Sequence, residues 1–187
     1  MIFELRRYTL HAGRRDELIS LFEREFVDPQ LALGMTLPGL FRDAGDPDRF
    51  VWLRGFADMP ARKAALEAFY GGPVWKTHRD AANATMIDSD NVLLLKVVRD
   101  FAPDARTGSP VTAMIHCFDA PVGEDLAEKA AAEPFLAVFR GEHSENTFPA
   151  LPVRLGEHVL VTFGPGPALS DRVETLTLLP TDRSVLR

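Results

Sequence analysis

The strongest constraint on the fold is the order in which strand-like and helix-like segments follow one another in the first hundred residues. Strand-like segments, rich in aromatic and β-branched residues, lie at 2–10, 40–44, 49–56 and 91–98. Helix-like segments lie at 14–33, 61–70 and 73–85. The resulting order, β-α-β-β-α-β, is that of a ferredoxin-like unit, so the sequence predicts an α+β fold.

Turn and capping residues mark the boundaries of these segments. The turn Gly45-Asp46-Pro47-Asp48 separates two strands and favours an antiparallel hairpin. Asp58 is placed to cap the following helix, Pro60 suits its first turn, and Gly71-Gly72 ends it. Pro29 predicts a kink or a new short turn in the first helix.

A second, shorter series of elements follows residues 101–110, a polar and turn-rich stretch that we interpret as a linker. Its strands are predicted at 111–119, 135–140, 158–163 and 173–178, with one helix at 124–133. The loop Gly164-Pro165-Gly166-Pro167 leaves little room for a second helix. We therefore predict one ferredoxin-like half at 1–100 and a second, degenerate half at 111–187.

Composition is that of an ordinary globular protein, with 187 residues of which 46% are hydrophobic. The net charge of −6 argues against nucleic acid as a partner, because phosphate binding requires clustered Lys and Arg. A single cysteine, Cys117, allows no intrachain disulfide, and the N-terminal residues lack the pattern of a signal peptide. The apolar run at 91–98 is too short to span a membrane. We expect a cytoplasmic protein without a membrane span.

Several segments taken together resemble the NIPSNAP family. They are the opening strand and turn at 3–13, the strand Phe50-Val51-Trp52-Leu53-Arg54-Gly55-Phe56, Trp75, the segment 146–154 and the tail 177–184. The resemblance covers nearly the whole chain. It implies a dimeric α/β-barrel type of structure, here made from the two halves of one chain, and makes a homo-oligomer plausible. It assigns no reaction, and fold relatives that include monooxygenases, isomerases and haem peroxidases do not choose one.

The alternation of the first strand separates two sets of side chains. Phe3, Leu5 and Arg7 share one face, and Glu4, Arg6 and Tyr8 share the other. We expect the first set to pack on helices and the second to line the barrel interior, together with Trp52 and Arg54. Aromatic rings and guanidiniums there would bind a flat or anionic ligand. Alternatively, Trp52 belongs to the core, and Arg6 and Arg54 pair with Glu4 or Asp43.

Two histidines are candidate catalytic residues. Trp75 and His78 are three apart and would share a helix face, where His78 could act as a general base. A haem site would be expected to carry an Asn on the first strand, as in haem-degrading fold relatives, and this chain has none there. His116 alternates with Met114 and Phe118 and could point into the barrel, or be a core histidine with satisfied hydrogen bonds. We expect no metal site and no cofactor.

The segment from Asn146 to Arg154 contains two prolines that impose an extended path. Asn146 could bond to backbone or ligand, and Arg154 could hold an anionic group, or the segment could be a rigid loop. No hydrolase triad, nucleotide-binding glycine motif or paired metal motif is present. The sequence therefore favours a protein that binds a small hydrophobic or aromatic molecule. The alternatives are a cofactor-independent monooxygenase or isomerase, and a non-catalytic interaction protein.

Overall fold

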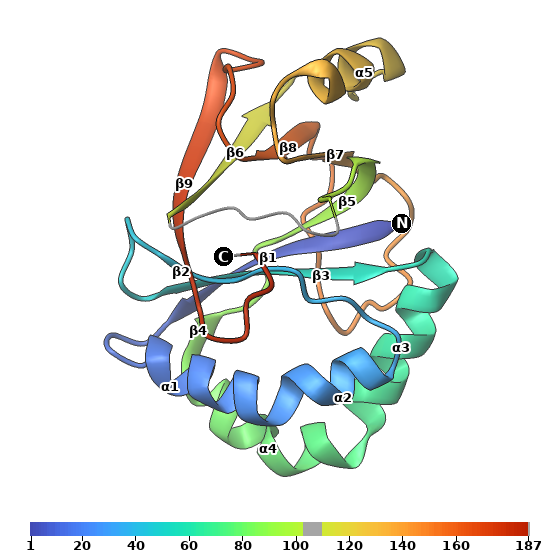
Figure 1. Cartoon of the computed structure of the whole chain (residues 1–187). Coiled ribbons are helices and arrows are strands. Elements are labelled where there is room, and N and C mark those ends of the chain that lie inside the picture. Colours follow the sequence, from blue (N-terminus) through green and yellow to red (C-terminus); the bar gives the residue numbers. More distant parts are fainter. Residues whose placement is uncertain (103–109, 187) are drawn as a thin grey trace.

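Eight antiparallel strands close into a barrel in the computed structural model, which describes residues 1–102 and 110–186 (Figure 1). The strands are β1 (Ile2–Leu10), β2 (Leu40–Asp43), β3 (Arg49–Phe56), β5 (Val92–Arg99), β6 (Val111–Cys117), β7 (Ala137–Gly141), β8 (Val159–Phe163) and β9 (Arg172–Pro180). Around the barrel they follow the order β1-β3-β2-β9-β6-β8-β7-β5, and β5 pairs again with β1. A ninth strand, β4 (Met86–Asp88), pairs with the end of β1.

The two parts of the chain contribute four barrel strands each. Residues 1–100 supply the run β2-β3-β1-β5, and residues 111–180 supply the run β9-β6-β8-β7. The runs join at two seams, where β2 pairs with β9 and β5 pairs with β7. All of these strands were predicted, within three residues at each end, whereas the short strand β4 was not.

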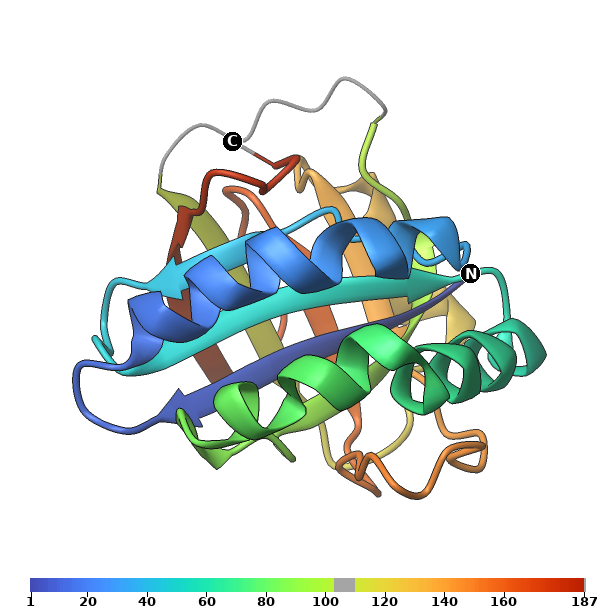
Figure 2. The ribbon, with the colours of Figure 1, turned by 90° about the horizontal axis from the view of Figure 1, so that it is seen from below.

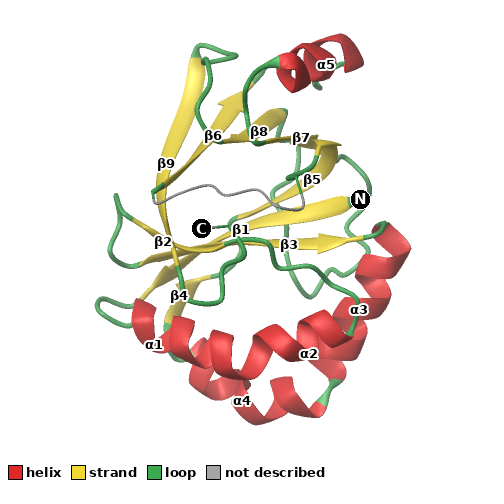
Figure 3. Ribbon diagram, in the orientation of Figure 1, coloured by secondary structure: helices red, strands yellow, loops and turns green. Residues whose placement is uncertain are grey.

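Helices cover the outside of the barrel unevenly (Figure 3). Four segments lie over β1 and β3, namely α1 (Arg15–Leu21), α2 (Val27–Ala32), α3 (Met59–Gly71) and α4 (Pro73–Asn83), while α5 (Glu124–Ala132) lies on the other side (Figure 2). The expected cap is present, because Asp58 accepts a hydrogen bond of 2.7 Å from the backbone N–H of Ala61.

The first helical region is continuous but contains one wide turn. The π turn η1 (Phe22–Phe26) joins α1 to α2, with the N–H of Val27 bonded to the carbonyl of Phe22. Pro29 lies just beyond it and has no N–H to donate to the preceding turn. The sequence predicted a kink or a new short turn at Pro29, whereas the irregularity in the structure is a π turn that precedes the proline. Such turns are common at functional sites.

The barrel interior is filled by apolar side chains from both parts of the chain. Phe3 and Leu5 of β1 meet Ile115 of β6 and Phe139 of β7 there, and the rings of Phe3 and Phe139 are 5.2 Å apart. Arg7 shares this face, and its guanidinium reaches Glu174 of β9 at 2.9 Å. A filled interior is what small barrels usually have.

The expected orientation of β1 is therefore wrong. The face that was expected to pack on helices points into the barrel, and the face with Glu4, Arg6 and Tyr8 lies under the helices, as do Trp52 and Arg54 of β3. The alternation of side chains along a strand defines its two faces but does not show which face points into the barrel. Here the more apolar face is enclosed by eight strands, and the polar face is buried by a second layer. The predicted linker, 101–110, falls mostly outside the described residues.

Candidate functional site

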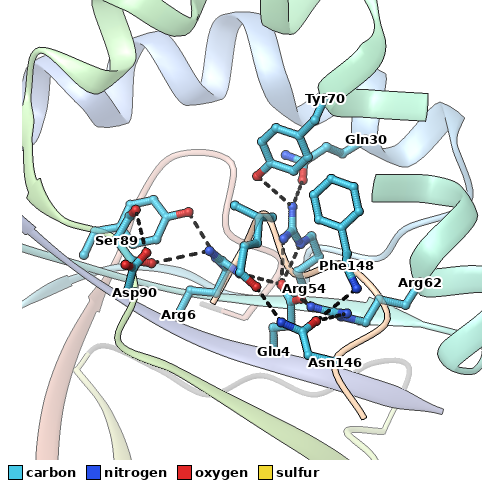
Figure 4. Close-up of polar contacts among 12 residues, drawn as sticks. Glu4, Arg6, Gln30, Arg54, Arg62, Tyr70, Ser89, Asp90, Asn146 and Phe148 are labelled. Carbon is cyan, nitrogen blue, oxygen red and sulfur yellow. Dashed lines mark hydrogen bonds and ion pairs between the residues drawn. The ribbon is translucent and has the colours of Figure 1, made fainter. Parts of the chain in front are cut away.

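The carboxylate of Glu4, at the centre of β1, is surrounded by three guanidiniums (Figure 4). Its Oε2 accepts from Arg6 Nη1 at 2.8 Å and from Arg54 Nε and Nη2 at 3.0 and 2.6 Å. Its Oε1 accepts from Arg62 Nε at 2.7 Å; Arg62 Nη2 is equally close but lies at an angle that makes no hydrogen bond. Both carboxylate oxygens are thus in use, so Glu4 is unsuited to act as a general base.

This Glu4–Arg6–Arg54–Arg62 group, which we call the arginine cluster, is almost completely buried. None of its side chains is more than 1% exposed. Each of the three arginines pairs with Glu4, and no second carboxylate pairs with them within residues 1–102 and 110–186. One negative and three positive charges leave two positive charges unbalanced in a region of low dielectric constant.

The local electrostatics fix the protonation states. Burial by itself would raise the pKa of Glu4, but the guanidiniums of Arg54, Arg6 and Arg62 outweigh it and hold that pKa far below its usual range. Burial opposes the charge of Arg54, yet the nearby Glu4 carboxylate raises its pKa. Burial also raises the pKa of the Tyr8 phenol, so Tyr8 keeps its proton at neutral pH.

Neutral polar groups surround the arginine cluster. Arg6 Nε donates to Tyr8 Oη at 3.0 Å, and Arg54 Nη1 donates to Gln30 Oε1 at 3.1 Å and to Tyr70 Oη at 3.4 Å. On the other side, Arg62 Nη1 donates to Asn146 Oδ1 at 3.0 Å. Asn146 lies in the loop between β7 and β8, so the second part of the chain contributes directly to this group.

A pocket lined mainly by aromatic rings lies next to these polar groups, between the outer face of β1 and β3 and the helices. We call it the aromatic pocket; its free volume is about 30 Å³, so its lining side chains nearly fill it. Its lining residues are Tyr8, Leu18, Phe22, Phe26, Gln30, Trp52, Phe69, Tyr70, Trp75, Ala82 and Met86. Both tryptophans of the chain are among them. This volume is far below that of typical ligand sites, which is roughly 300–1,000 Å³.

One polar atom in the wall of the aromatic pocket has no partner within residues 1–102 and 110–186. Trp52 Nε1 is buried and makes no hydrogen bond in the part of the chain that the structure describes. The Trp52 ring lies near two guanidiniums, with the central carbons of Arg6 and Arg54 at 5.5 and 5.1 Å from the ring centre. A buried donor without an acceptor is destabilising, and such groups often mark a place where a ligand supplies the acceptor.

The structure brings together most of the residues predicted as ligand-binding. Tyr8, Trp52 and Trp75 line the aromatic pocket, while Arg6 and Arg54 belong to the arginine cluster and Asn146 bonds to it. Their location is the helix-covered outer face of the barrel and not its interior. Arg154 lies elsewhere, paired with Glu157 at 2.7 Å.

The two candidate histidines lie apart from each other. His78 is near the aromatic pocket, because its ring and the ring of Trp75 both pack against Phe26. The ring centres of His78 and Trp75 lie 6.3 and 5.6 Å from the ring centre of Phe26. His78 Nε2 is 3.4 Å from a carboxylate oxygen of Glu25. His116 is on the far side of the barrel, where its ring packs 6.3 Å from that of Phe135.

His116 has the bonding of a neutral core histidine. Its Nδ1 accepts from the backbone N–H of Leu169 at 3.2 Å, and its Nε2 is 3.1 Å from Thr162 Oγ1. Burial lowers its pKa. The structure gives His116 no contact with the aromatic pocket or the arginine cluster.

The sequence-based prediction did not include three polar residues of the site, namely Gln30, Arg62 and Tyr70, or the apolar residues that line the aromatic pocket. Arg62 carried a usable signal, because it occupies the apolar stripe of α3 with Ala65, Leu66 and Phe69. A charged residue on a buried stripe requires a partner. Gln30 and Tyr70 lie at the ends of their helices and carry no comparable signal.

Neither a metal site nor a membrane-crossing helix is evident in the described part of the chain. No three His, Cys, Asp or Glu side chains gather closely enough to hold a metal ion within residues 1–102 and 110–186. No helix in those ranges has the length and apolar character needed to cross a membrane.

The fold is an α/β barrel, and an aromatic pocket beside a buried arginine cluster is its candidate site for a small molecule. The family profile described as NIPSNAP matches residues 3–100, just over half of the chain. The chain therefore belongs to the NIPSNAP family, whose members among the solved structures include uncharacterised proteins. No curated protein matches it in sequence.

Solved structures show the same fold over nearly the whole chain. A candidate monooxygenase from Lactobacillus acidophilus is 16% identical, with 95% of this chain and 92% of that chain covered and a TM-score of 0.62. One from Fusobacterium nucleatum is 12% identical, covering 96% and 91%, with a TM-score of 0.59. An uncharacterised NIPSNAP domain protein from Burkholderia xenovorans is 22% identical and covers 56% of this chain and 100% of its own, with a TM-score of 0.48.

Proposed function

We propose that this protein binds a small aromatic or hydrophobic molecule in the aromatic pocket between the barrel and its helices. The observation that carries the proposal is a pocket walled by aromatic rings in which the buried indole N–H of Trp52 lacks an acceptor among the residues that the structure describes. Aromatic walls favour a flat ligand, because edge-to-face and stacked contacts add to the burial of apolar surface. The half-buried rings of Tyr70 and Trp75 lie nearest to solvent.

The size of the pocket limits the ligand. The free volume of about 30 Å³ is far below that of typical ligand sites, so the ligand is at most a molecule with one ring, and rings of the wall must move aside to admit it. A suitable pair of probes is 2-aminobenzoate and 2-aminobenzamide, which are fluorescent, have one ring and differ mainly in charge. Because both tryptophans line the pocket, energy transfer from tryptophan to either probe reports on binding there.

The experiment compares two helix alanines that are both buried. Ala82→Leu places a larger side chain in the wall of the aromatic pocket, whereas Ala130→Leu overpacks α5 on the other side of the barrel. Each change is expected to lower stability by about 1–3 kcal/mol. We expect saturable energy transfer with at least one probe, unchanged in Ala130→Leu and lost in Ala82→Leu. Absence of saturation with both probes, or equal binding by the two variants, would overturn the proposal.

An enzyme is the second candidate function. Two structures that share the fold over more than 90% of their own chains carry names that describe candidate monooxygenases, and this observation favours oxygenation over other chemistry. The test is oxygen uptake with 1,4-dihydroxybenzene as the probe. Oxygen uptake faster than the rate without protein supports the enzyme, provided that it persists in Ala130→Leu and disappears in Ala82→Leu. Uptake equal to the protein-free rate rules out oxygenation of this probe.

The filled barrel interior favours a third candidate, a non-catalytic interaction protein, which would remain if neither probe binds. We also infer that the barrel consists of two ferredoxin-like halves in tandem, 1–100 and 111–187, that together form one dimeric-barrel-type unit. The same strand order in both halves supports this view. A cytoplasmic location and a homo-oligomer remain proposals, and native mass spectrometry of the purified protein tests the second.

A further inference from the structure

We propose that the ligand of the aromatic pocket carries an anionic group, of which a carboxylate on an aromatic ring is the best fit, and that Tyr8, Tyr70 and Trp52 receive this group. The inference rests on the proposed function and specifies its ligand class. It is carried by two features, the charge balance of the arginine cluster and the hydrogen-bond donors and acceptors of the pocket.

The first feature is the unbalanced charge. Arg6, Arg54 and Arg62 share one carboxylate, that of Glu4, and all four side chains are at most 1% exposed. Water cannot solvate the two remaining positive charges as it would at the surface, so they disfavour the ligand-free state. A bound anion would compensate part of that charge, whereas a neutral ligand would compensate none of it.

The second feature is that the pocket has spare donors but lacks a spare charged acceptor. Trp52 Nε1–H has no partner in the described part of the chain. The hydroxyl oxygens of Tyr8 and Tyr70 accept hydrogen bonds from Arg6 and Arg54, and neither hydroxyl has an acceptor for its own proton among the described residues. The remaining polar group, Gln30, is already used, because its amide nitrogen donates to the carbonyl of Phe26. A group with several acceptor lone pairs meets these donors best.

The two features are linked through the tyrosines. Each tyrosine that lines the pocket is hydrogen-bonded to an arginine behind it. Tyr8 accepts from Arg6 at 3.0 Å, and Tyr70 accepts from Arg54 at 3.4 Å (Figure 4). A hydroxyl that accepts from a guanidinium becomes a stronger donor through its own proton. An anion in the pocket would thus meet polarised O–H groups first and the positive field of the arginine cluster behind them. These residues bind and orient the ligand.

The test is the ratio of two dissociation constants, measured by energy transfer from tryptophan at neutral pH in chloride-free buffer. The probes are 2-aminobenzoate and its neutral analogue 2-aminobenzamide. We expect the carboxylate to bind about tenfold more tightly or better, because charge-assisted hydrogen bonds are roughly twice as strong as neutral ones. Sodium formate, which carries the charge without the ring, should compete with the carboxylate probe.

Variants separate recognition from folding. Tyr8→Phe and Tyr70→Phe keep the rings and the ion pairs of Glu4 but remove the hydroxyl donors, and each should reduce the ratio by about three- to tenfold. Arg6→Gln should reduce it further, although this variant could lose stability. The control is Arg140→Gln, which removes one positive charge at the pair with Glu124 on the far side of the barrel and should leave the ratio unchanged.

Each outcome decides a separate point. Equal or tighter binding of the amide in the native protein overturns the anion inference and leaves the aromatic-binding function in place. A ratio that favours the carboxylate but is unchanged in both Tyr→Phe variants overturns the assignment of the donors. Failure of both probes to saturate overturns the proposed function itself, and the anion inference with it.

Discussion

Glu4 is predicted to be the side chain on which the stability of the helix-covered face depends most. The variant Glu4→Gln keeps the shape of the side chain and removes its charge, so three buried guanidiniums lose their common partner. Breaking a buried ion pair by removing one partner costs roughly 3–5 kcal/mol. Because the three pairs share one carboxylate, their contributions are not additive, and we expect a loss of about this size and not three times it.

The assay is urea denaturation followed by tryptophan fluorescence and circular dichroism. For a domain of this length, the expected loss corresponds to a fall in melting temperature of roughly 6–20 °C. The matched control is Glu17→Gln, which removes a carboxylate from an exposed pair with Arg14 and should change stability little. A loss of less than about 1 kcal/mol in Glu4→Gln would refute the reasoning, since that is the range of surface pairs.

The pH dependence isolates the contribution of Glu4. The guanidiniums hold its folded-state pKa far below the usual value of 4.5 that applies in the unfolded chain. The folded state therefore binds fewer protons than the unfolded state below pH 4.5, and the stabilisation is present above that pH and is lost as the pH falls through the folded-state pKa. The difference in stability between the native protein and Glu4→Gln should shrink steadily from pH 5 towards acid. A difference independent of pH would contradict the assigned pairing.

Three further predictions concern backbone fit, titration and capping. Gly55→Ala would place a Cβ against the buried ring of Phe3 and should cost about 1–3 kcal/mol in urea denaturation, whereas Gly71→Ala meets nothing within 4 Å and should be neutral or stabilising. Burial lowers the pKa of His116, so it binds fewer protons when folded; stability should fall as the pH drops below 6.5, and His116→Gln should remove that component of the pH profile. Asp58→Ala should cost about 1 kcal/mol by loss of the α3 cap, and an unchanged urea midpoint would contradict the cap.

Local signals in the sequence were sufficient for most of the secondary structure. The turn at 45–48, the cap at Asp58 and the glycines at 71–72 act over a few residues, so the hairpin and the end of α3 could be predicted without tertiary information. Strand β4 was missed because three residues carry too short a pattern, and its pairing with β1 depends on the position of α4. The π turn at 22–26 was missed for a related reason, since no residue type specifies it.

The members of the candidate site were easier to predict than their location. Four members could be predicted because polar and aromatic residues alternate on strands that are otherwise apolar. They are Arg6, Tyr8, Trp52 and Arg54. The same pattern suggested that this face lined the barrel, and that expectation was wrong. Whether a strand face points into the barrel or under the helices depends on how the sheet curves, which no local pattern records.

The sequence by itself determined the order of the elements, the two faces of each strand, the family and the residue types that bind flat or charged groups. These properties follow from periods of two and 3.6 residues and from turn chemistry, which act locally along the chain. Only the tertiary structure decided that β2 meets β9 and β5 meets β7, that the apolar face fills the barrel, and that three arginines from β1, β3 and α3 converge on one carboxylate. Convergence of this kind depends on contacts between residues up to 58 positions apart, and packing fixes it only when the whole barrel has closed.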